Sequence, residues 1–213
     1  MDVMDSNKDS VVQRRILITD GLIIPKKGDY LFSIILKKEC ILEDVVPLLK
    51  KEKLKANDKV LVSVGSYDIT AKQCGWDYNL IKTKEGLVED AVGEFNQNLK
   101  CIKEYAIEHG LNVAICGLIP LPNEQCYDLA SDNKKELTYL LSSLFEKCSK
   151  EVKNTNDKFR FLCLEKYLTR GCNKKYKSGQ LKIKEDYYKQ GVPNEERKNI
   201  LMDRVSDYLT RLR

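Results

Sequence analysis

Hydrophobic positions along this chain follow two alternating patterns, short β-branched runs and longer stretches with helical spacing. The short runs predict strands at residues 15–19, 30–36, 59–64, 112–119 and 159–164. The helical spacing predicts helices over residues 41–54, 89–109, 134–153 and 195–212. Pro47 leaves open a kink near the start of the first helix.

Strands that alternate with helices at this spacing imply right-handed crossovers and a parallel sheet covered on both faces. We therefore expect an α/β protein, a flavodoxin-like three-layer α/β/α sandwich with a parallel five-stranded sheet. Residues 14–213 should form a single domain of this kind after a disordered start at residues 1–13.

Tight turns follow the first and third predicted strands. Asp20 and Gly21 come directly after the first apolar run, and Gly65 and Asp68 follow the third. Because the carboxyl ends of parallel strands meet at one edge of the sheet, both turns should lie together there. Ligands of α/β proteins bind at this edge, so the sequence predicts a functional site at the two turns.

The composition narrows the class of protein. No apolar run reaches the roughly 18 to 20 residues of a membrane-spanning helix, and the polar, acidic start differs from a secretory signal. The eight cysteines are scattered without a C-x-x-C pair, which favours reduced, buried thiols over disulfides or a zinc site. With a single histidine, His109, we expect no metal and no cofactor, and a cytoplasmic location.

Positive charge is concentrated in the last third of the chain. The net charge is +5, but residues 150–213 hold 17 Lys/Arg and 9 Asp/Glu, a net +8, while residues 1–149 hold 20 and 23, a net −3. This enrichment favours a polyanionic partner, although a solvated, lysine-rich face would give the same count. The candidate RNA-binding side chains follow the second and fifth predicted strands or precede and begin the last helix: Lys37, Lys38, Arg170, Lys174, Lys175, Lys177, Lys182, Lys184, Lys189, Arg197 and Lys198.

Tyrosines lie among these basic residues. Tyr176, Tyr187 and Tyr188 could stack on unpaired bases, which points to single-stranded or looped RNA. They could equally pack the basic loop onto the domain. The sequence leaves both alternatives open.

Four motifs resemble, in their order, the blocks of SGNH (GDSL-type) hydrolases across nearly the whole chain. They are Ile-Leu-Ile-Thr-Asp-Gly-Leu-Ile at 16–23, Val-Leu-Val-Ser-Val-Gly-Ser-Tyr-Asp-Ile at 60–69, Val-Ala-Ile-Cys-Gly-Leu-Ile-Pro at 113–120 and Gly-Val-Pro-Asn at 191–194. The first motif corresponds to the family's first block, Gly-Asp-Ser, and the second motif corresponds to its third block, Gly-x-Asn-Asp. The last motif corresponds to the family's last block, Asp-x-x-His. The resemblance implies the α/β/α fold of these hydrolases.

The first two matched motifs imply that the serine chemistry of the family has been lost. Asp20 keeps the family aspartate, but Gly21 stands in the position of the nucleophile and has no atom with which to attack. Gly65 is kept, whereas Tyr67 replaces the asparagine that helps to hold the oxyanion.

The last motif lacks a base in either alignment. With Pro193 as anchor, Val192 takes the place of the histidine and Lys189 that of the aspartate. With Asp186 aligned to the family aspartate, Lys189 takes the place of the histidine instead. Neither residue can accept the proton of a serine, so the sequence predicts no catalytic residues and a chain that is not an enzyme.

Two alternatives to this hypothesis remain. An esterase with a rearranged active site would use Ser63 or Ser66 as nucleophile and His109 as a relocated base. A histidine just before Gly110 is, however, typical of a helix end, and a serine in a tight turn is typical of local hydrogen bonding. The other alternative is a protein scaffold that binds partners through the terminal helix.

The degenerate blocks, the basic C-terminal region and the amphipathic terminal helix resemble those of OSK domains. These are SGNH-like domains without catalytic residues that are associated with RNA binding and germ plasm assembly. The resemblance implies a pseudoenzyme that binds mRNA in cytoplasmic ribonucleoprotein granules and has germ plasm proteins as partners. It also implies a developmental role in germ cell formation and posterior patterning.

Overall fold

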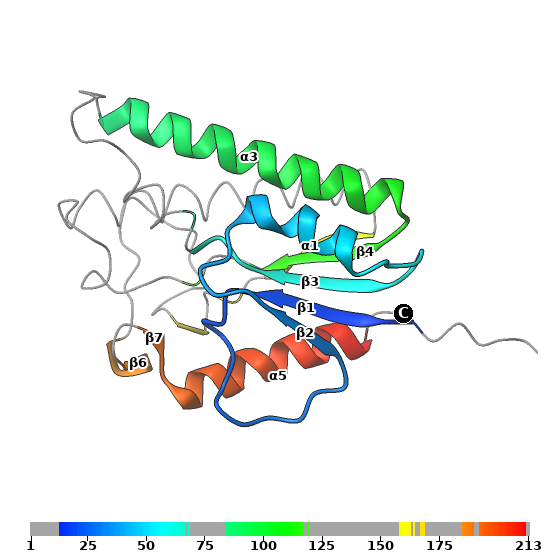
Figure 1. Ribbon diagram of the computed structural model, residues 1–213. Helices are drawn as coiled ribbons and strands as arrows, with labels where there is room; N and C mark the ends of the chain where they lie inside the picture. Colours follow the sequence, from blue (N-terminus) through cyan, green and yellow to red (C-terminus); the bar gives the residue numbers. More distant parts are fainter. Residues whose placement is uncertain are drawn as a thin grey trace, which may run out of the picture.

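Five parallel strands form one sheet in the computed structural model, in the order β2-β1-β3-β4-β5 (Figure 1). They are β1 (Arg15–Thr19), β2 (Ser33–Leu36), β3 (Lys59–Ser63), β4 (Asn112–Cys116) and β5 (Phe159–Leu162). This order confirms the predicted flavodoxin-like sheet. The structure describes residues 13–66, 68, 84–116, 119, 158–162, 164, 167–168, 185–189 and 192–211, so the helix predicted over 134–153 lies outside it.

Helices cover both faces of the sheet, as predicted. The short 3-10 turn η1 (Leu42–Asp44), α1 (Val45–Lys51) and α3 (Lys84–Glu108) lie on one face, and α5 (Glu195–Arg211) lies on the other (Figure 1). Successive side chains of a strand point to opposite faces, and β1 follows this rule. Ile16 and Ile18 pack in the core beneath α1 and α3, while Leu17 packs in the core beneath α5.

The helix boundaries differ from the predicted ones for local reasons. The helix predicted at 41–54 is shorter, and Pro47 causes no break because it stands in the first turn of α1, where its missing N–H would have no intrahelical acceptor. Helix α3 begins earlier than predicted, and it ends just before Gly110, whose φ of +63° suits a residue without a side chain. At the start of α5, Asn194 Oδ1 accepts the Arg197 N–H at 3.0 Å and caps the helix.

An antiparallel hairpin precedes α5 and was not predicted. Strand β6 (Tyr188–Lys189) pairs with β7 (Val192–Pro193) and follows the 3-10 turn η4 (Glu185–Tyr187). Two-residue strands are too short for an alternating pattern to be recognised in a sequence. The hairpin lies at the end of the sheet toward which the parallel strands run (Figure 1).

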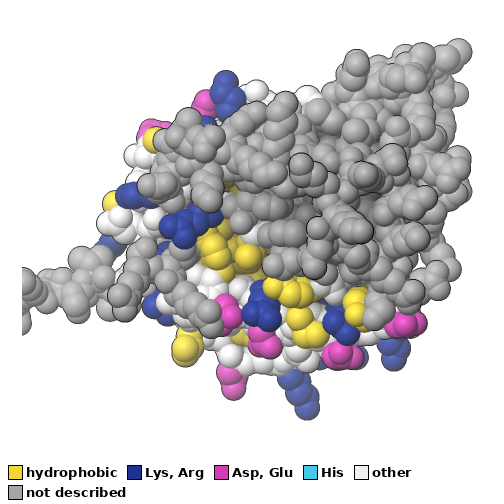
Figure 2. Space-filling view, turned by 180° about the vertical axis from the view of Figure 1, so that it is seen from behind, with side chains coloured by type: hydrophobic (Ala, Val, Ile, Leu, Met, Phe, Trp, Pro, Cys, Tyr) yellow, Lys and Arg dark blue, Asp and Glu magenta, His cyan; other side chains and the backbone are white. Residues whose placement is uncertain are grey.

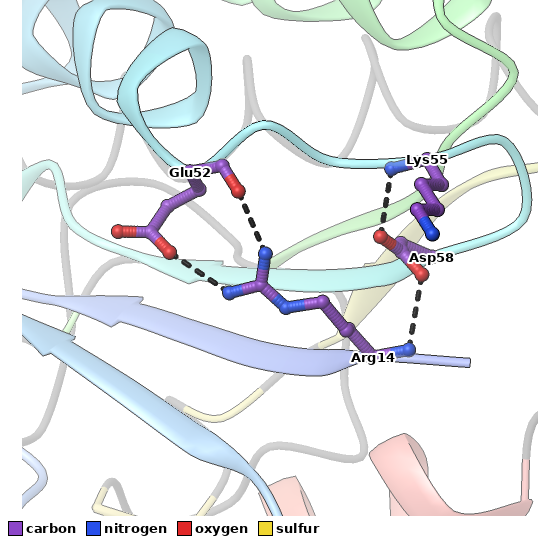
Figure 3. A network of polar contacts seen from close by, with 4 residues as sticks. All are labelled: Arg14, Glu52, Lys55 and Asp58. Carbon is purple, nitrogen blue, oxygen red and sulfur yellow. Dashed lines mark hydrogen bonds and ion pairs between the residues drawn. The ribbon is translucent and has the colours of Figure 1, made fainter. Parts of the chain in front are cut away.

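A buried carboxylate stabilises the edge of the sheet at the amino ends of the strands (Figure 3). Asp58, which is 2% exposed, accepts the backbone N–H of Arg14 at 3.0 Å and that of Lys55 at 2.8 Å. The Arg14 guanidinium in turn donates to the backbone oxygen and the carboxylate of Glu52. The network therefore joins the start of β1 to the end of α1 and to the loop before β3.

Candidate active site at the carboxyl edge of the sheet

The turn after β1 is held in shape by its own side chains. Asp20 is 5% exposed, and its Oδ1 accepts the Leu22 N–H at 3.0 Å. Thr19 Oγ1 accepts the Gly21 N–H at 3.1 Å. Gly21 has a φ of +95°, a conformation that residues with a side chain rarely adopt. This turn therefore needs a glycine in the position that aligns with the serine of SGNH hydrolases.

The turn after β3 lies beside it, as the sequence predicts. The Asp20 N–H points to the Ser63 carbonyl at 3.5 Å, and Gly65 repeats the left-handed conformation with a φ of +118°. Asp68 is 2% exposed, and its Oδ2 accepts the Leu42 N–H at 2.9 Å, which ties this turn to η1. Tyr67, which aligns with the oxyanion asparagine of SGNH hydrolases, lies outside the described residues.

Burial changes the acid–base properties of this edge. Desolvation raises the pKa of Asp20 to about 7, against the lowering effect of backbone hydrogen bonds and with a further contribution from the Asp68 charge. A carboxyl group with such a pKa can exchange a proton at neutral pH. Asp20 is therefore the chemically distinctive residue of the site.

Cys40 lies within the field of the same acids, which favours its protonated thiol. Desolvation raises the pKa of the Cys40 thiol to about 12, and the charges of Asp44, Asp20 and Asp68 add to this effect while Lys37 opposes it. The thiolate is the reactive form of cysteine, and it is scarcely populated at neutral pH.

The rearranged serine site considered from the sequence is not assembled. Ser66 is buried, and its hydroxyl donates to the Ile119 carbonyl at 2.9 Å and accepts the Ile119 N–H at 3.1 Å, so it links two strand ends. His109 lies at the amino edge, because the adjacent Gly110 carbonyl accepts the N–H of Asn57, two residues before β3. Its exposed ring contacts Tyr105, with the two ring centroids 4.2 Å apart and the ring planes tilted by 45°.

The residues aligned with the last block of SGNH hydrolases face each other across the hairpin. Lys189 in β6 pairs with Val192 in β7; Lys189 is exposed, and Val192 is half-buried against the core beneath α5. Tyr188 packs against the same core, and burial raises its pKa. The Arg197 guanidinium lies over the Tyr187 ring, with its Cζ 3.5 Å from the ring centroid. For these two tyrosines the structure favours packing of the loop over stacking on bases.

Several of the predicted RNA-binding side chains are engaged with acids. Lys37 forms an ion pair with Asp44, Arg197 pairs with Glu196 at 3.1 Å, and Lys198 pairs with Glu195 at 3.4 Å. Lys38 is exposed. Basic and acidic side chains alternate over the described part of the surface shown in Figure 2. The remaining candidates lie outside the described residues: Arg170, Lys174, Lys175, Lys177, Lys182 and Lys184.

Leu36 is a site residue that the sequence analysis missed. It ends β2 opposite Thr19, is 53% exposed, and its Cδ1 lies 3.0 Å from the position that a Cβ atom would take at Gly21. Its place at the carboxyl end of a strand was the signal that could have identified it. Among the described residues, no cluster of acids, cysteines or histidines could hold a metal ion, and no helix could cross a membrane.

Comparisons with solved structures identify the fold. The chain is similar to a GDSL-like lipase from Bacteroides thetaiotaomicron, with 14% identity, a TM-score of 0.57 and coverage of 93% of this chain and 88% of the other. An acetyl xylan esterase gives 10% identity, a TM-score of 0.55 and coverage of 92% of this chain and 99% of the other. A psychrotrophic esterase from Pseudoalteromonas sp. gives 12% identity, a TM-score of 0.53 and coverage of 93% of this chain and 98% of the other. No protein-family model matches the sequence, and no curated protein has significant similarity to it.

These comparisons contradict the prediction that the chain is not an enzyme, because solved proteins with this fold include GDSL-type lipases and esterases. The prediction relied on the absence of a serine and a histidine from their family positions. It overlooked the remaining carboxyl group, whose pKa depends on burial and could not be judged from the sequence. The chain has the SGNH (GDSL-type) hydrolase-like α/β/α fold.

Proposed function

We propose that this chain hydrolyses a carboxylic ester by direct attack of water, with Asp20 as the general base. The observation that carries the proposal is a buried carboxyl group with a pKa of about 7 at the edge of the sheet where α/β proteins bind ligands. The esterases and lipases with the same fold support this class of reaction.

Gly21 leaves the turn beside Asp20 without a side chain, and Leu36 Cδ1 lies 3.0 Å from the position that a Cβ would take there. The proposed reaction therefore requires the Leu36 side chain to turn away, so that an ester carbonyl can approach the strand end at Gly21 with a water molecule between it and the carboxylate.

The proposed reaction is a single displacement. The Asp20 carboxylate removes a proton from water, and the resulting hydroxide attacks the carbonyl carbon to form a tetrahedral intermediate. The bond from that carbon to the alcohol oxygen then breaks, and protonated Asp20 gives its proton to the departing alkoxide. The products are a carboxylic acid and an alcohol, and no acyl group is attached to the protein.

Turnover of p-nitrophenyl butyrate by the wild type and by Asp20→Asn tests the proposal. The account predicts hydrolysis without an initial burst and a loss of at least about a hundredfold in kcat for Asp20→Asn, since general-base catalysis contributes about 10² to 10⁴. Asp29→Asn removes an exposed carboxylate from the loop before β2 and is the matched control. A burst of p-nitrophenol with an acyl adduct in the mass spectrum would contradict the mechanism.

We propose RNA binding as a second function, carried by the basic last third of the chain, as the likeness to OSK domains implies. The net charge of +8 over residues 150–213 supports it, and hydrolysis at the sheet edge does not exclude it. Such binding would place the chain in cytoplasmic ribonucleoprotein granules of the germ plasm.

Fluorescence anisotropy with single-stranded RNA at about 0.15 M salt tests this second proposal. Replacing Lys174, Lys175, Lys182 and Lys184 by glutamate should abolish binding, whereas Lys198→Glu should weaken it less because Lys198 is already paired with Glu195. Binding that survives the fourfold change would contradict the proposal. A partner pulled down after nuclease treatment would instead favour the scaffold alternative.

A further inference from the structure

Two basic side chains lie next to each other at the amino edge of the sheet, on the face that α5 covers. Arg15 begins β1, Lys59 begins β3, and the two residues are partners in the register of these neighbouring strands. Leu17 and Leu61, two residues further along the same strands, pack in the core beneath α5. Since side chains two residues apart in a strand share a face, Arg15 and Lys59 point to the α5 side as well.

No acid among the described residues pairs with these two cations. Lys59 is 3% exposed, and the Nε atom of Arg15 is buried and has no hydrogen-bond acceptor in the described part of the chain. Burial lowers the pKa of Lys59, and the charge of Arg15 lowers it further. The neighbouring carboxylate of Asp58 instead accepts two backbone N–H groups, and Glu52 pairs with Arg14.

Two adjacent positive charges in this setting oppose folding unless a negative charge offsets them. Like charges on neighbouring strands repel each other, and a buried charge without a partner loses its hydration. The last turn of α5 lies at the same end of the sheet (Figure 1), but a helix C-terminus supplies only about half a negative charge. That is about a quarter of what two cations need. The pair therefore favours a bound anion.

We propose that Arg15 and Lys59 bind the phosphate group of a small anion at the amino edge of the sheet. A guanidinium presents paired N–H donors that match the oxygens of phosphate, and the ammonium adds a second positive charge. A phosphate group carries about two negative charges near neutral pH and offsets both cations, whereas a carboxylate offsets one. Arg15 is half-buried, so a small anion can reach the pair, but the backbone of an RNA cannot reach Lys59. This site is independent of the ester hydrolysis proposed for Asp20.

Isothermal titration calorimetry of the full chain with sodium phosphate, at neutral pH and about 0.15 M salt, tests the proposal. One phosphate should bind to each chain. Lys59→Met and Arg15→Met should each weaken binding at least about tenfold, because each removes a charged donor and keeps an apolar stem. Lys55→Met is the matched control, since Lys55 is an exposed lysine in the loop before β3, and it should bind phosphate as the wild type does.

Thermal unfolding gives a second readout. Phosphate at about a hundred times its Kd should raise the Tm of the wild type by about 5 °C over chloride at equal ionic strength, and should not change the Tm of Lys59→Met. In chloride, Lys59→Met should unfold at the same temperature as the wild type or higher, because it removes a buried charge without a partner. A lower Tm would mean that the ammonium is already paired within the protein, which would contradict the proposal.

Adenosine monophosphate and single-stranded RNA distinguish the possible sources of the phosphate group. Tighter binding of adenosine monophosphate than of inorganic phosphate would assign the site to a phosphomonoester, and the reverse order would assign it to free phosphate; both results support the proposal. Single-stranded RNA should not displace the bound phosphate. Displacement by RNA, or a wild type that binds neither small anion, would overturn the proposal.

Discussion

The raised pKa of Asp20 predicts that this residue destabilises the fold at neutral and alkaline pH. Its pKa is about 7 in the folded chain against 3.8 for an ordinary aspartate. A raised carboxyl pKa gives stability that is complete below pH 3.8 and is lost as pH rises through about 7, because the folded state binds more protons between these values. At about 1.4 kcal/mol for each pKa unit, the full loss is about 4 kcal/mol.

Replacing Asp20 by asparagine removes this pH dependence. The asparagine side chain has nearly the same shape, can still accept the Leu22 N–H, and does not ionise. The free energy of unfolding of Asp20→Asn should therefore increase relative to the wild type by about 3 kcal/mol between pH 5 and pH 8. The variant that loses turnover should thus be the more stable protein in alkaline buffer.

Urea denaturation followed by far-ultraviolet circular dichroism at pH 5, 6, 7 and 8 measures this difference. Asp29→Asn, the same chemical change at an exposed position, controls for the loss of one negative charge. If the difference between Asp20→Asn and the wild type is equal at pH 5 and pH 8, Asp20 does not titrate near neutrality. The reasoning about its role as a base would then be refuted.

Three further substitutions test the structural account by urea denaturation. Asp58→Ala should lower the free energy of unfolding by about 2 to 4 kcal/mol, since it leaves two backbone N–H groups at the amino edge without their acceptor. A reduction below about 1 kcal/mol would contradict the network in Figure 3. Ser66→Ala should lower the free energy of unfolding by about 1 to 3 kcal/mol and leave turnover within about threefold of the wild type. Lost turnover at unchanged stability would instead indicate a serine nucleophile. Gly21→Ala should lower the free energy of unfolding by about 1 to 2 kcal/mol because of its φ of +95°, and an unchanged stability would contradict a turn that needs a glycine.

The sheet could be predicted from the sequence because its strands are local, nearly continuous apolar runs. The bounds of β1 are the predicted ones, since a charged residue precedes its four buried positions and Asp20 follows them. Strand β2 begins later than predicted because Tyr30 and Phe32 stack on each other and pack against the core beneath α5 before strand pairing begins.

The site could be located from the sequence, but its chemistry could not. Two glycine turns after two apolar runs placed it at the carboxyl edge, and the glycine of each turn has a positive φ. The pKa of Asp20 depends on how deeply several separate segments bury it. The ion pair of Lys37 with Asp44 likewise depends on the path of the chain between β2 and α1, so the sequence could not show that this candidate RNA-binding side chain is paired with an acid.

The pH dependence of kcat/KM for p-nitrophenyl butyrate tests the central claim most directly. If Asp20 is the general base, kcat/KM of the wild type rises with pH, reaches half of its plateau near pH 7, and falls at least a hundredfold in Asp20→Asn at pH 8. A profile without an inflection between about pH 6 and 8, or a plateau that Asp20→Asn leaves unchanged, would contradict the claim.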